Sequence, residues 1–263
     1  MPPPKFLNAL FKRVFRFELF LLAKRLLFPG LDLHTRCRYR FLPRFFRPGP
    51  LLDTLDAGFG NGALSYAAWK LGNRVLGISF DAEQIRKARV FFAACGVAPD
   101  RLQFEVFDLR NLPKLNGKFD QIICSETLEH IRDDRAVIRG FHELLRPGGV
   151  LHLCCPYALH PEHRLGRTDG PEDGGHVRDG YTPESYKALL EPAGFEILKQ
   201  VGLGSPLLAR LDKILRRLKE LGGDLLAFPF FLVIWPLQFL DHTDPAVPFS
   251  LYVQAVKKEL PPV

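Results

Sequence analysis

The stretch LDAGFGNGA, residues 55–63, decides the fold of this 263-residue chain. It follows an apolar run, residues 51–57, and leads into a segment with a helical pattern that reaches Lys70. A glycine-rich turn between a strand and a helix suits ligand binding, because glycine lets the backbone approach a bound molecule closely. The turn also satisfies the G-x-G-x-x-A spacing of dinucleotide-binding proteins, so the neighbouring residues have to decide which ligand it holds.

Asp56 argues against a diphosphate in this turn. It stands two residues before Gly58, where its negative charge would oppose a pyrophosphate at the helix N-terminus. S-adenosylmethionine fits better, because its ammonium and sulfonium groups can lie near Asp56 while its carboxylate meets the helix N-terminus. At this point a purely structural glycine turn is the alternative.

The middle of the chain alternates strand and helix patterns, which is typical of an α/β sheet with helices on both faces. Asp81 is placed to cap a helix at 81–95, and Thr182 with Pro183 opens another at 182–194. The predicted strands are 51–57, 74–80, 102–108, 119–125, 150–156, 195–201 and 249–256.

Five motifs occur in the order and spacing of the class I S-adenosylmethionine-dependent methyltransferases, and the chain resembles that family over approximately residues 50–202. The motifs are DAGFGNG (56–62), GISFD (77–81), FEVFDL (104–109), FDQIICSETLEHI (119–131) and LRPGGVLHL (145–153). The resemblance implies an α/β fold with a Rossmann-like seven-stranded sheet, helices on both faces and an antiparallel last strand. It also implies an enzyme with S-adenosylmethionine as its methyl donor.

One position departs from the family's pattern. Where an acidic residue usually takes both ribose hydroxyls, this chain has Ser79, and we expect Asp81 or Gln84 to supply the second bond. The other cofactor contacts are implied by position: Asp56, Gly58, Gly60 and Gly62 for the methionyl part, Ser125 near the methyl group, and Asp108 with Leu109 for the adenine.

The segment SETLEHI, residues 125–131, is where we expect the acceptor chemistry. Methyl transfer needs proximity, orientation and often a base, and His130 with Glu129 is the candidate catalytic pair. The E-x-x-E-H spacing also resembles the ubiquinone-pathway O-methyltransferases and the small-RNA 2′-O-methyltransferases, in which a similar motif binds a divalent ion. By that resemblance a metal site would use Glu126, Glu129, His130 and His176. The LEH sequence is also widespread in methyltransferases without a metal, so both interpretations stay open.

Residues 157–182 form a polar stretch that is too long for a simple connection, and we predict a lid over the site. The segment GHVRDGYTPESYKALLEPAGF, residues 175–195, resembles methyltransferases encoded with bacterial surface-polysaccharide genes, which keeps a sugar hydroxyl among the acceptors. His160 and His163 are candidate lid groups. Arg164, Arg167 and Arg178 make the lid basic, which would suit an anionic acceptor such as a phosphate or carboxylate.

The net charge of +7 is concentrated at the N-terminus, where residues 1–48 hold eleven Lys or Arg and two acidic residues. Between Lys5 and Leu21 the basic side chains fall on one side of a helical wheel and the Leu, Phe and Val side chains on the other. This pattern predicts a basic amphipathic helix at an anionic surface. Lipid is favoured over nucleic acid, because the charges alternate with large apolar residues.

Residues 203–248 contain an amphipathic helix pattern at 206–221 and then an uncharged run at 225–240. A membrane span needs about 20 apolar residues, and Pro229 and Pro236 interrupt this run. We therefore predict an interfacial or re-entrant hairpin in preference to a transmembrane helix, with packing into the core as the alternative.

Four regions follow from these patterns. They are a basic amphipathic arm (1–48), the S-adenosylmethionine-binding core (49–202), a helical apolar insertion (203–248), and the last strand with a tail (249–263).

The five cysteines have neither CxxC nor zinc spacing, and the N-terminus lacks the pattern of a secretory signal. We expect a cytoplasmic protein that lies peripherally on the inner face of the membrane.

The predicted function is methylation, on oxygen or carbon, of a small lipophilic or lipid-linked acceptor at the membrane surface. The alternatives are a sugar or RNA 2′-O-methyltransferase, with the arm gripping phosphates, and a non-catalytic scaffold with the methyltransferase fold. No Asn/Asp-Pro-Pro-Tyr signature follows the fourth strand, which disfavours a nucleic-acid base as acceptor. The intact glycine turn and Asp108 disfavour the scaffold.

Overall fold

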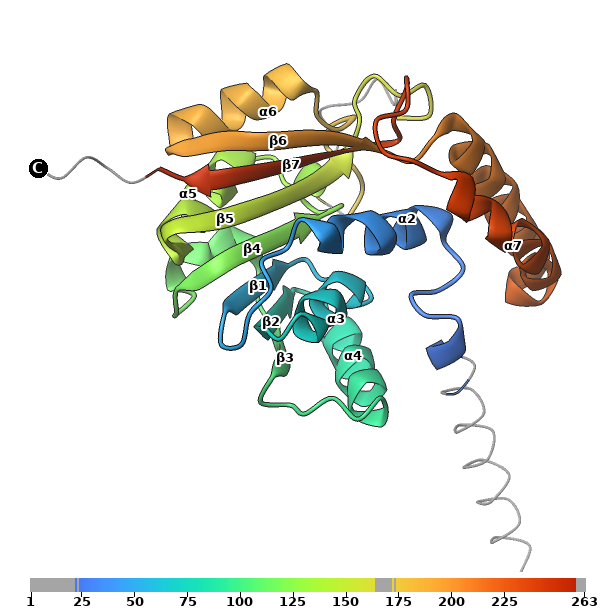
Figure 1. Cartoon of the computed structure of the whole chain (residues 1–263), viewed down its shortest axis with the longest axis horizontal. Coiled ribbons are helices and arrows are strands. Elements are labelled where there is room, and N and C mark those ends of the chain that lie inside the picture. The colour runs from blue at the N-terminus through green and yellow to red at the C-terminus, as the bar shows by residue number, and fades with distance from the viewer. Residues whose placement is uncertain (1–21, 23, 164–171, 173, 259–263) are drawn as a thin grey trace, which may run out of the picture.

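The computed structural model describes residues 22, 24–163, 172 and 174–258. Seven strands form one sheet: β1 (Asp53–Ala57), β2 (Arg74–Ser79), β3 (Leu102–Val106), β4 (Phe119–Ser125), β5 (Leu145–Pro156), β6 (Phe195–Leu203) and β7 (Ser250–Lys257). Their order across the sheet is β3-β2-β1-β4-β5-β7-β6 (Figure 1). β1 pairs in parallel with β2 and β4, whereas β7 runs antiparallel to β5 and β6. The predicted seven-stranded sheet with an antiparallel last strand is confirmed.

The strand order turns at β1, since β2 and β3 lie on one side of it and β4 and β5 on the other. In open α/β sheets a crevice forms at the carboxyl ends of the strands where the order reverses, and ligands bind there. The glycine turn leaves β1 at this place, so the topology puts the predicted cofactor residues at the ligand-binding end of the sheet.

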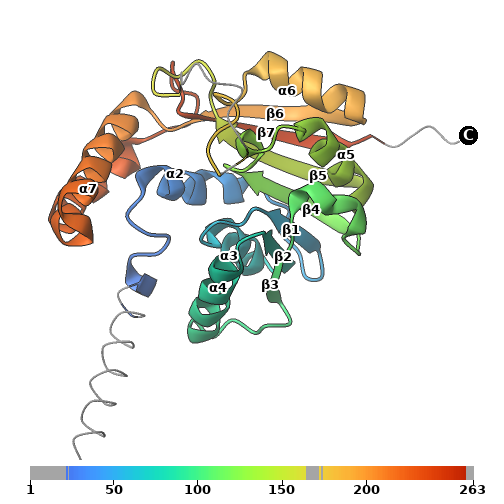
Figure 2. The same cartoon turned by 180° about the vertical axis from the view of Figure 1, so that it is seen from behind.

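Helices cover both faces of the sheet, as the alternating pattern predicted (Figures 1 and 2). Phe91, Phe92 and Tyr252 are buried on one face, and Phe141, Tyr186 and Phe195 on the other. The helices are α2 (Leu33–Phe41), α3 (Ala63–Lys70), α4 (Ala82–Ala94), α5 (Asp134–Leu144) and α6 (Pro183–Leu190), with short 3-10 helices η1 (Leu42–Arg44), η2 (Leu109–Lys114), η3 (Leu128–His130) and η4 (Glu191–Ala193). The side chains of Asp81 and Thr182 cap α4 and α6 as expected.

A helical hairpin, α7 (Pro206–Ile234) followed by η5 (Trp235–Leu240), projects from the edge of the sheet (Figure 1). Gly222 and Gly223 have non-helical backbone angles, and the chain doubles back there. Leu215 before the turn and Phe231 after it belong to the same hydrophobic cluster, which holds the two arms together. The predicted helical insertion before the last strand is confirmed.

The N-terminal region differs from the expectation in its second half. The amphipathic helix predicted between Lys5 and Leu21 lies outside the described residues. Beyond it, α2 packs against the core with Leu33 and Phe41 buried, so the folded unit begins before residue 49. The sequence pattern predicts that the basic residues of α2 belong to a surface arm, but Arg40 donates to the backbone carbonyl of Gln238 in the hairpin at 2.6 Å.

Candidate active site

The glycine turn follows β1 directly and opens α3. The N–H of Gly58 donates to the carbonyl of Ile78 at 2.9 Å, which ties the turn to β2. Gly58, Gly60 and Gly62 all have positive φ. A Cβ on Gly58 would overlap the side chain of Thr127, whereas a Cβ on Gly60 would meet nothing within 4 Å. Gly58 is therefore required for packing, and Gly60 presents open backbone to a ligand.

Asp56 is 1% exposed at the end of β1. It lines a cavity of about 320 Å³ with Gly58, Gly60 and Ser125, and its carboxylate accepts a hydrogen bond of 2.5 Å from Ser65 Oγ. Burial raises the pKa of Asp56 to about 7, because the carboxylate loses its hydration, and the hydrogen bond from Ser65 only partly opposes this effect. A cationic group beside Asp56 would restore the ionised form, so the site fits the ammonium group of S-adenosylmethionine.

Ser125 supports the same fit. Its Oγ is buried in that cavity and has no hydrogen-bond partner among the described residues. Buried polar groups in native proteins are nearly always paired, so an unpaired hydroxyl facing a cavity indicates a missing ligand or water. The residue predicted to lie near the methyl group therefore has hydrogen-bonding capacity to spare.

A larger cavity of about 520 Å³ continues from the glycine turn across the ends of β2 and β3. It brings together Ser79, Asp81 and Gln84, the three residues expected to contact the ribose. Ser79 Oγ accepts from the N–H of Asp81 at 3.2 Å, and Asp81 Oδ1 accepts from the N–H groups of Glu83 and Gln84. Asp81 therefore caps α4 with one carboxylate oxygen and keeps the other for a ligand.

Asp108 reaches this cavity with its carboxylate already engaged. Arg110 donates to it through Nη2 at 2.6 Å and Nε at 3.0 Å, and these hydrogen bonds lower the pKa of Asp108. Arg110 also pairs with Glu172 at 3.2 Å. Leu109 lines the cavity beside Asp108, as expected. An adenine contact through Asp108 would share the carboxylate with Arg110, a residue that the sequence analysis missed.

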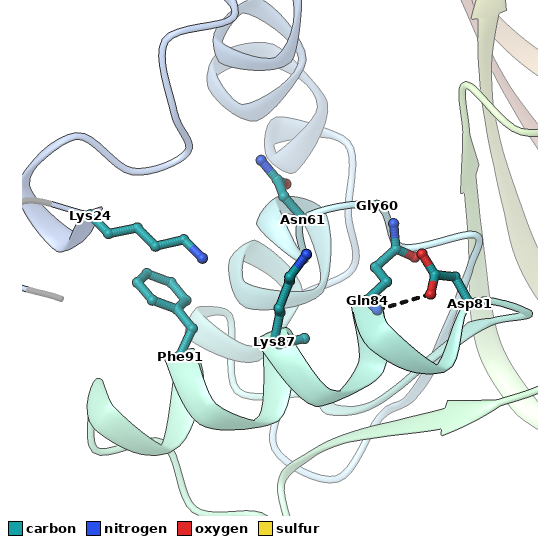
Figure 3. Close-up of a pocket in the computed structure, with 8 residues that line it drawn as sticks. Lys24, Gly60, Asn61, Asp81, Gln84, Lys87 and Phe91 are labelled. Carbon is teal, nitrogen blue, oxygen red and sulfur yellow. Dashed lines mark hydrogen bonds between the residues drawn. The ribbon is translucent and has the colours of Figure 1, made fainter. Parts of the chain in front are cut away.

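A third cavity, of about 270 Å³, lies on the α4 side of the glycine turn (Figure 3). It shares Gly60, Asp81 and Gln84 with the larger cavity and is therefore an extension of it. Lys24 and Lys87 point into this space, and Lys24 Nζ lies 4.7 Å from the centroid of the Phe91 ring. The segment just before α2 thus reaches the rim of the cofactor site.

Glu129, His130 and His176 form the cluster expected around the acceptor. One ligand atom from each lies within 4.8 Å of the others. Glu129 is fully buried and neither of its carboxylate oxygens has a hydrogen-bond partner among the described residues. Burial, with a smaller contribution from Glu126, raises the pKa of Glu129 to about 8. His130 Nδ1 lies 3.0 Å from the carbonyl of Gly175, which can only accept, so Nδ1 carries the proton and Nε2 has the lone pair.

Glu126 lies apart from this cluster, although the sequence grouped it with the metal ligands. Its carboxylate pairs with Arg38 of α2 at 3.3 Å and accepts a hydrogen bond from Ser250 Oγ at 3.2 Å. Its φ is +50°, a strained conformation for a residue with a side chain. The described cluster of potential metal ligands therefore contains three residues where four were predicted. Arg38 was missed because the sequence analysis assigned its charge to the N-terminal arm.

The two ends of the predicted lid are held together and against the site. Tyr157 and Tyr181 form a β-bridge, and the N–H of Val177 donates to the carbonyl of Glu129. Arg178 pairs with Asp134 and donates to the carbonyls of Ile131 and Arg132. These bonds occupy both Nη groups of Arg178, so its guanidinium group already has partners within the fold. Arg164 and Arg167 lie outside the described residues.

The histidines at the start of the lid are packed, not solvated. His160 and His163 are 5% and 7% exposed and both contact the ring of Phe249, with centroid distances of 5.1 and 4.3 Å. The sequence could not show this, because Phe249 lies far along the chain. His163 lines a cavity beside the donor site, whereas His160 contributes packing.

Comparison with known proteins agrees with this geometry. Residues 31–200 match the family model described as a methyltransferase domain. The chain belongs to this methyltransferase family. With its seven-stranded sheet and glycine turn it is a class I S-adenosylmethionine-dependent methyltransferase. The match begins at residue 31 and thus includes α2, in agreement with the packing of that helix on the core.

Among curated proteins the methyltransferase is similar to ubiquinone biosynthesis O-methyltransferases. It is 32% identical over 150 residues to the enzyme of Xanthomonas euvesicatoria pv. vesicatoria, covering 54% of this chain and 62% of the relative. It is 37% identical over 157 residues to the enzyme of Pseudomonas paraeruginosa, covering 57% and 66%. The matched part therefore spans less than two thirds of the length of these relatives.

Solved structures share the fold at low sequence identity. The YcgJ protein from Bacillus subtilis superimposes with a TM-score of 0.58 at 18% identity, covering 84% of this chain and 98% of that one. Magnesium protoporphyrin IX methyltransferase from Synechocystis, solved with bound S-adenosylhomocysteine, gives a TM-score of 0.52 at 18% identity, covering 80% and 75%. These likenesses support the fold of the methyltransferase.

Proposed function

We propose that this methyltransferase transfers a methyl group from S-adenosylmethionine to an oxygen or carbon atom of a small lipophilic or lipid-linked acceptor at the cytoplasmic surface of a membrane. The observation that carries the proposal is the juxtaposition of a cofactor cavity with an exposed apolar hairpin. The ubiquinone biosynthesis enzymes to which the chain is similar support an acceptor of this class.

On the donor side, the chain would hold the cofactor from both ends. Asp56 would pair with the ammonium group, and the open backbone at Gly60 would meet the carboxylate. Ser79, Asp81 and Gln84 would bind the ribose, with Asp108 and Leu109 at the adenine. When bound, the donor supplies an electrophilic methyl group on its sulfonium.

His130 is the candidate base for the acceptor. It lines the larger cavity, and the centroid of its ring lies 4.7 Å from that of His176. A hydroxyl acceptor loses its proton when its oxygen gains the methyl group, and a neutral imidazole can accept that proton. Since Nδ1 of His130 donates to the carbonyl of Gly175, the free lone pair is on Nε2. Glu129 Oε1 lies 3.7 Å from Nε2. Because burial raises the pKa of Glu129 to about 8, its carboxyl group is mostly protonated at neutral pH and would stabilise the imidazolium only after it ionises.

A divalent ion is a second way to use the same three side chains. A buried carboxylate without hydrogen bonds beside two histidines has the donor set of Mn²⁺ or Zn²⁺. Burial and the neighbouring His130 lower the pKa of His176, which keeps it neutral and able to bind a metal. The ion would orient and activate an acceptor hydroxyl, and chelator treatment followed by re-addition of each metal tests this role by the transfer rate.

The hairpin supports the membrane location. Among the described residues, Pro206–Leu240 is the segment long and apolar enough to span a bilayer, yet only 17% of its most apolar window is buried. Because the segment folds back at Gly222 and Gly223, each arm is about 25 Å long, which is shorter than the ~30 Å hydrocarbon core. The basic residues of the first arm are paired with Glu162, Glu220 and Asp224. The support for membrane insertion therefore comes from the exposed apolar side chains of a hairpin that can insert part-way. The side chains concerned are Leu221, Leu225, Val233, Phe239 and Leu240, which are 60–88% exposed, with Lys213, Arg217 and Lys219 on the first arm.

The experiment that tests the proposal is transfer of radiolabelled methyl from S-adenosylmethionine into a host-cell extract, followed by partition between organic and aqueous phases. We expect label in the organic phase. Label in the aqueous phase alone would contradict the lipophilic acceptor and favour a soluble sugar or RNA, and ribonuclease treatment separates these two. No label with intact donor binding would favour the scaffold.

A further inference from the structure

A cavity of about 420 Å³ adjoins the donor site on the side of α2 and α7. It shares Thr35, Arg38 and Glu126 with the cavity around Asp56, so the Arg38–Glu126 ion pair stands at the border of the two. Its other walls come from the end of β5, both ends of the lid, α7 and the residue before β7. A space beside the methyl-donor end of the site is where an acceptor atom has to be held for in-line transfer.

The walls of this cavity are built for hydrogen bonding. Of its twelve lining residues, only Pro156 and Phe249 are apolar. Small-molecule sites are usually lined mainly by hydrophobic and aromatic side chains, and a flat aromatic acceptor such as a catechol would need walls of that kind. The cavity instead suits a ligand that offers many hydrogen-bond donors and acceptors in a small volume.

The charges of the walls disfavour an anionic ligand. Burial lowers the pKa of His34 to about 3, so this histidine adds no positive charge at neutral pH. Carboxylates outnumber guanidinium groups on the walls, and an entering phosphate or carboxylate would meet net repulsion. The charged residues are Asp32, Glu126, Glu162 and Asp212 against Arg38 and Arg216.

The same carboxylates are not free to bind a cation. Asp32 caps α2 by accepting from the N–H of Thr35, and Glu126 pairs with Arg38. Asp212 accepts from the N–H of Leu33 at 2.9 Å through Oδ1. Its Oδ2 makes no hydrogen bond among the described residues and lies 3.0 Å from Arg216 Nε as an ion pair. Glu162 lies 3.5 Å from Arg216 and 3.6 Å from Lys213. An amine would have to displace these partners, whereas a hydroxyl can share them, because it both donates and accepts.

We infer that this cavity binds the methyl acceptor through a neutral group with several hydroxyls, such as a glycosyl ring, and discriminates against phosphate, carboxylate and amine groups. The inference rests on the proposed function and specifies its acceptor. The inference also assigns a role to the adjoining hairpin. The hairpin would contact the membrane in which an apolar tail of the acceptor lies, while the hydroxylated group enters the cavity.

Two adjacent arginines on α7 offer a matched pair of variants. Arg216 lines the cavity and bonds to Asp212 and Glu162, whereas Arg217 pairs with Glu220 on its own helix and does not line it. Arg216→Gln removes a cavity wall group, and Arg217→Gln removes the same charge from outside the cavity. Glu162→Gln is a second cavity variant that does not touch the buried Asp212, in case Arg216→Gln weakens the hairpin.

The test measures the binding of four probes with the same alkyl chain, hexyl β-glucoside, hexyl phosphate, hexylamine and 4-hexylcatechol, to the full chain by calorimetry. Because the chain is common, differences between probes report the head group. We expect the glucoside to bind about five- to tenfold more tightly than each of the others, from one or two net hydrogen bonds. This preference falls severalfold in Arg216→Gln and Glu162→Gln and is unchanged in Arg217→Gln.

Tighter binding of the phosphate, the amine or the catechol would overturn the inference, as would an equal response of Arg216→Gln and Arg217→Gln. Each titration is run with and without S-adenosylhomocysteine, whose own affinity is measured in parallel. Failure of S-adenosylhomocysteine to bind would contradict the proposed function. The head-group preference measured without it still tests the cavity.

Discussion

The donor side and the acceptor side of this methyltransferase are built in different ways. The donor side consists of the ends of β1, β2, β3 and β4 and the loops that follow them, and each of its predicted cofactor-binding groups lies within a few residues of the end of a strand. The acceptor side joins α2, the lid, the hairpin and the residue before β7, which are far apart along the chain (Figure 1). The first arrangement follows from local sequence, whereas the second depends on how distant segments pack.

The donor side and the acceptor side also differ in whether their charged groups already have partners. On the donor side the decisive group is one buried carboxylate with a raised pKa, Asp56, which needs a cationic partner. On the acceptor side the charged groups already have partners, as in the Arg38–Glu126 pair. The donor side is thus prepared for a charged ligand and the acceptor side for a neutral one.

We expect the largest effect from a substitution that removes the charged group of the donor side. Asp56→Ala removes the partner of the ammonium group, and we expect S-adenosylmethionine affinity to fall on the order of a thousandfold, since losing one member of a buried ion pair costs about 3–5 kcal/mol. Calorimetric titration measures it. Asp53→Asn is the control, because Asp53 starts the same strand and, among the described residues, forms its ion pairs with Arg74 and Arg146 outside the cavity. Retained affinity in Asp56→Ala would mean that the ammonium group binds elsewhere.

The next effect separates the two sides. His130→Gln should lower the transfer rate about a hundredfold, which is the usual contribution of a general base, and leave donor affinity within about twofold of the wild type. Single-turnover transfer and donor titration measure the two quantities on the same sample. His160→Gln is the matched control, because His160 packs against Phe249 and does not line the described cavities around the donor. A parallel loss of donor affinity in His130→Gln would assign His130 to the donor side.

The pH dependence sharpens the electrostatic contrast. Asp56 titrates near 7 in the folded protein against 3.8 in the unfolded chain, so the ligand-free protein should lose stability as pH rises from about 4 to 7, by up to about 4 kcal/mol. The ammonium group needs the ionised carboxylate, so donor affinity should rise about tenfold per pH unit between about pH 5.5 and 7. Calorimetry in two buffers with different ionisation enthalpies should show one proton released on binding at pH 6. An affinity that does not vary over this range would mean that Asp56 is already ionised.

The smallest effect concerns the surface of the acceptor side. Leu225→Glu and Val233→Glu place charges on the exposed hairpin, where the two side chains are 88% and 75% exposed. We expect each to lower binding to anionic liposomes about tenfold, because a membrane-inserted charge costs more than 1.4 kcal/mol, with a change in unfolding free energy of at most ~0.5 kcal/mol. Leu198→Glu is the control, since Leu198 is 54% exposed on β6. A change of oligomeric state without a change in liposome binding would identify the hairpin as an interface between copies.

The sequence predicted the sheet and the cofactor side well, because these depend on short-range signals. The strand and helix patterns, the caps Asp81 and Thr182, and the glycine turn each act within a few residues. The ends of parallel strands meet at one edge of the sheet, so naming the strands was enough to bring Asp56 to one cavity and Ser79 and Asp108 to the larger cavity that shares Gly58 and Gly60 with it.

The sequence failed where one residue's role depended on a distant partner. The sequence predicted that Arg38 belongs to a basic surface arm, but in the structure it lies on α2 and pairs with Glu126. The sequence predicted that Arg178 binds an anionic acceptor, but in the structure it pairs with Asp134. Glu126 and Glu129 are separated by two residues, yet the first pairs with Arg38 while the second is buried beside His130. No local pattern distinguishes two such carboxylates.

The sequence by itself determined the class of this protein, its methyl donor and the end of the sheet where the donor binds, because backbone turns and strand periodicity act over short distances. The tertiary structure alone decided which charged groups neutralise one another, how the hairpin folds back, and which side chains line the acceptor cavity. The physical reason is that burial and ion pairing depend on neighbours in space, and on the acceptor side those neighbours come from α2, the lid and α7.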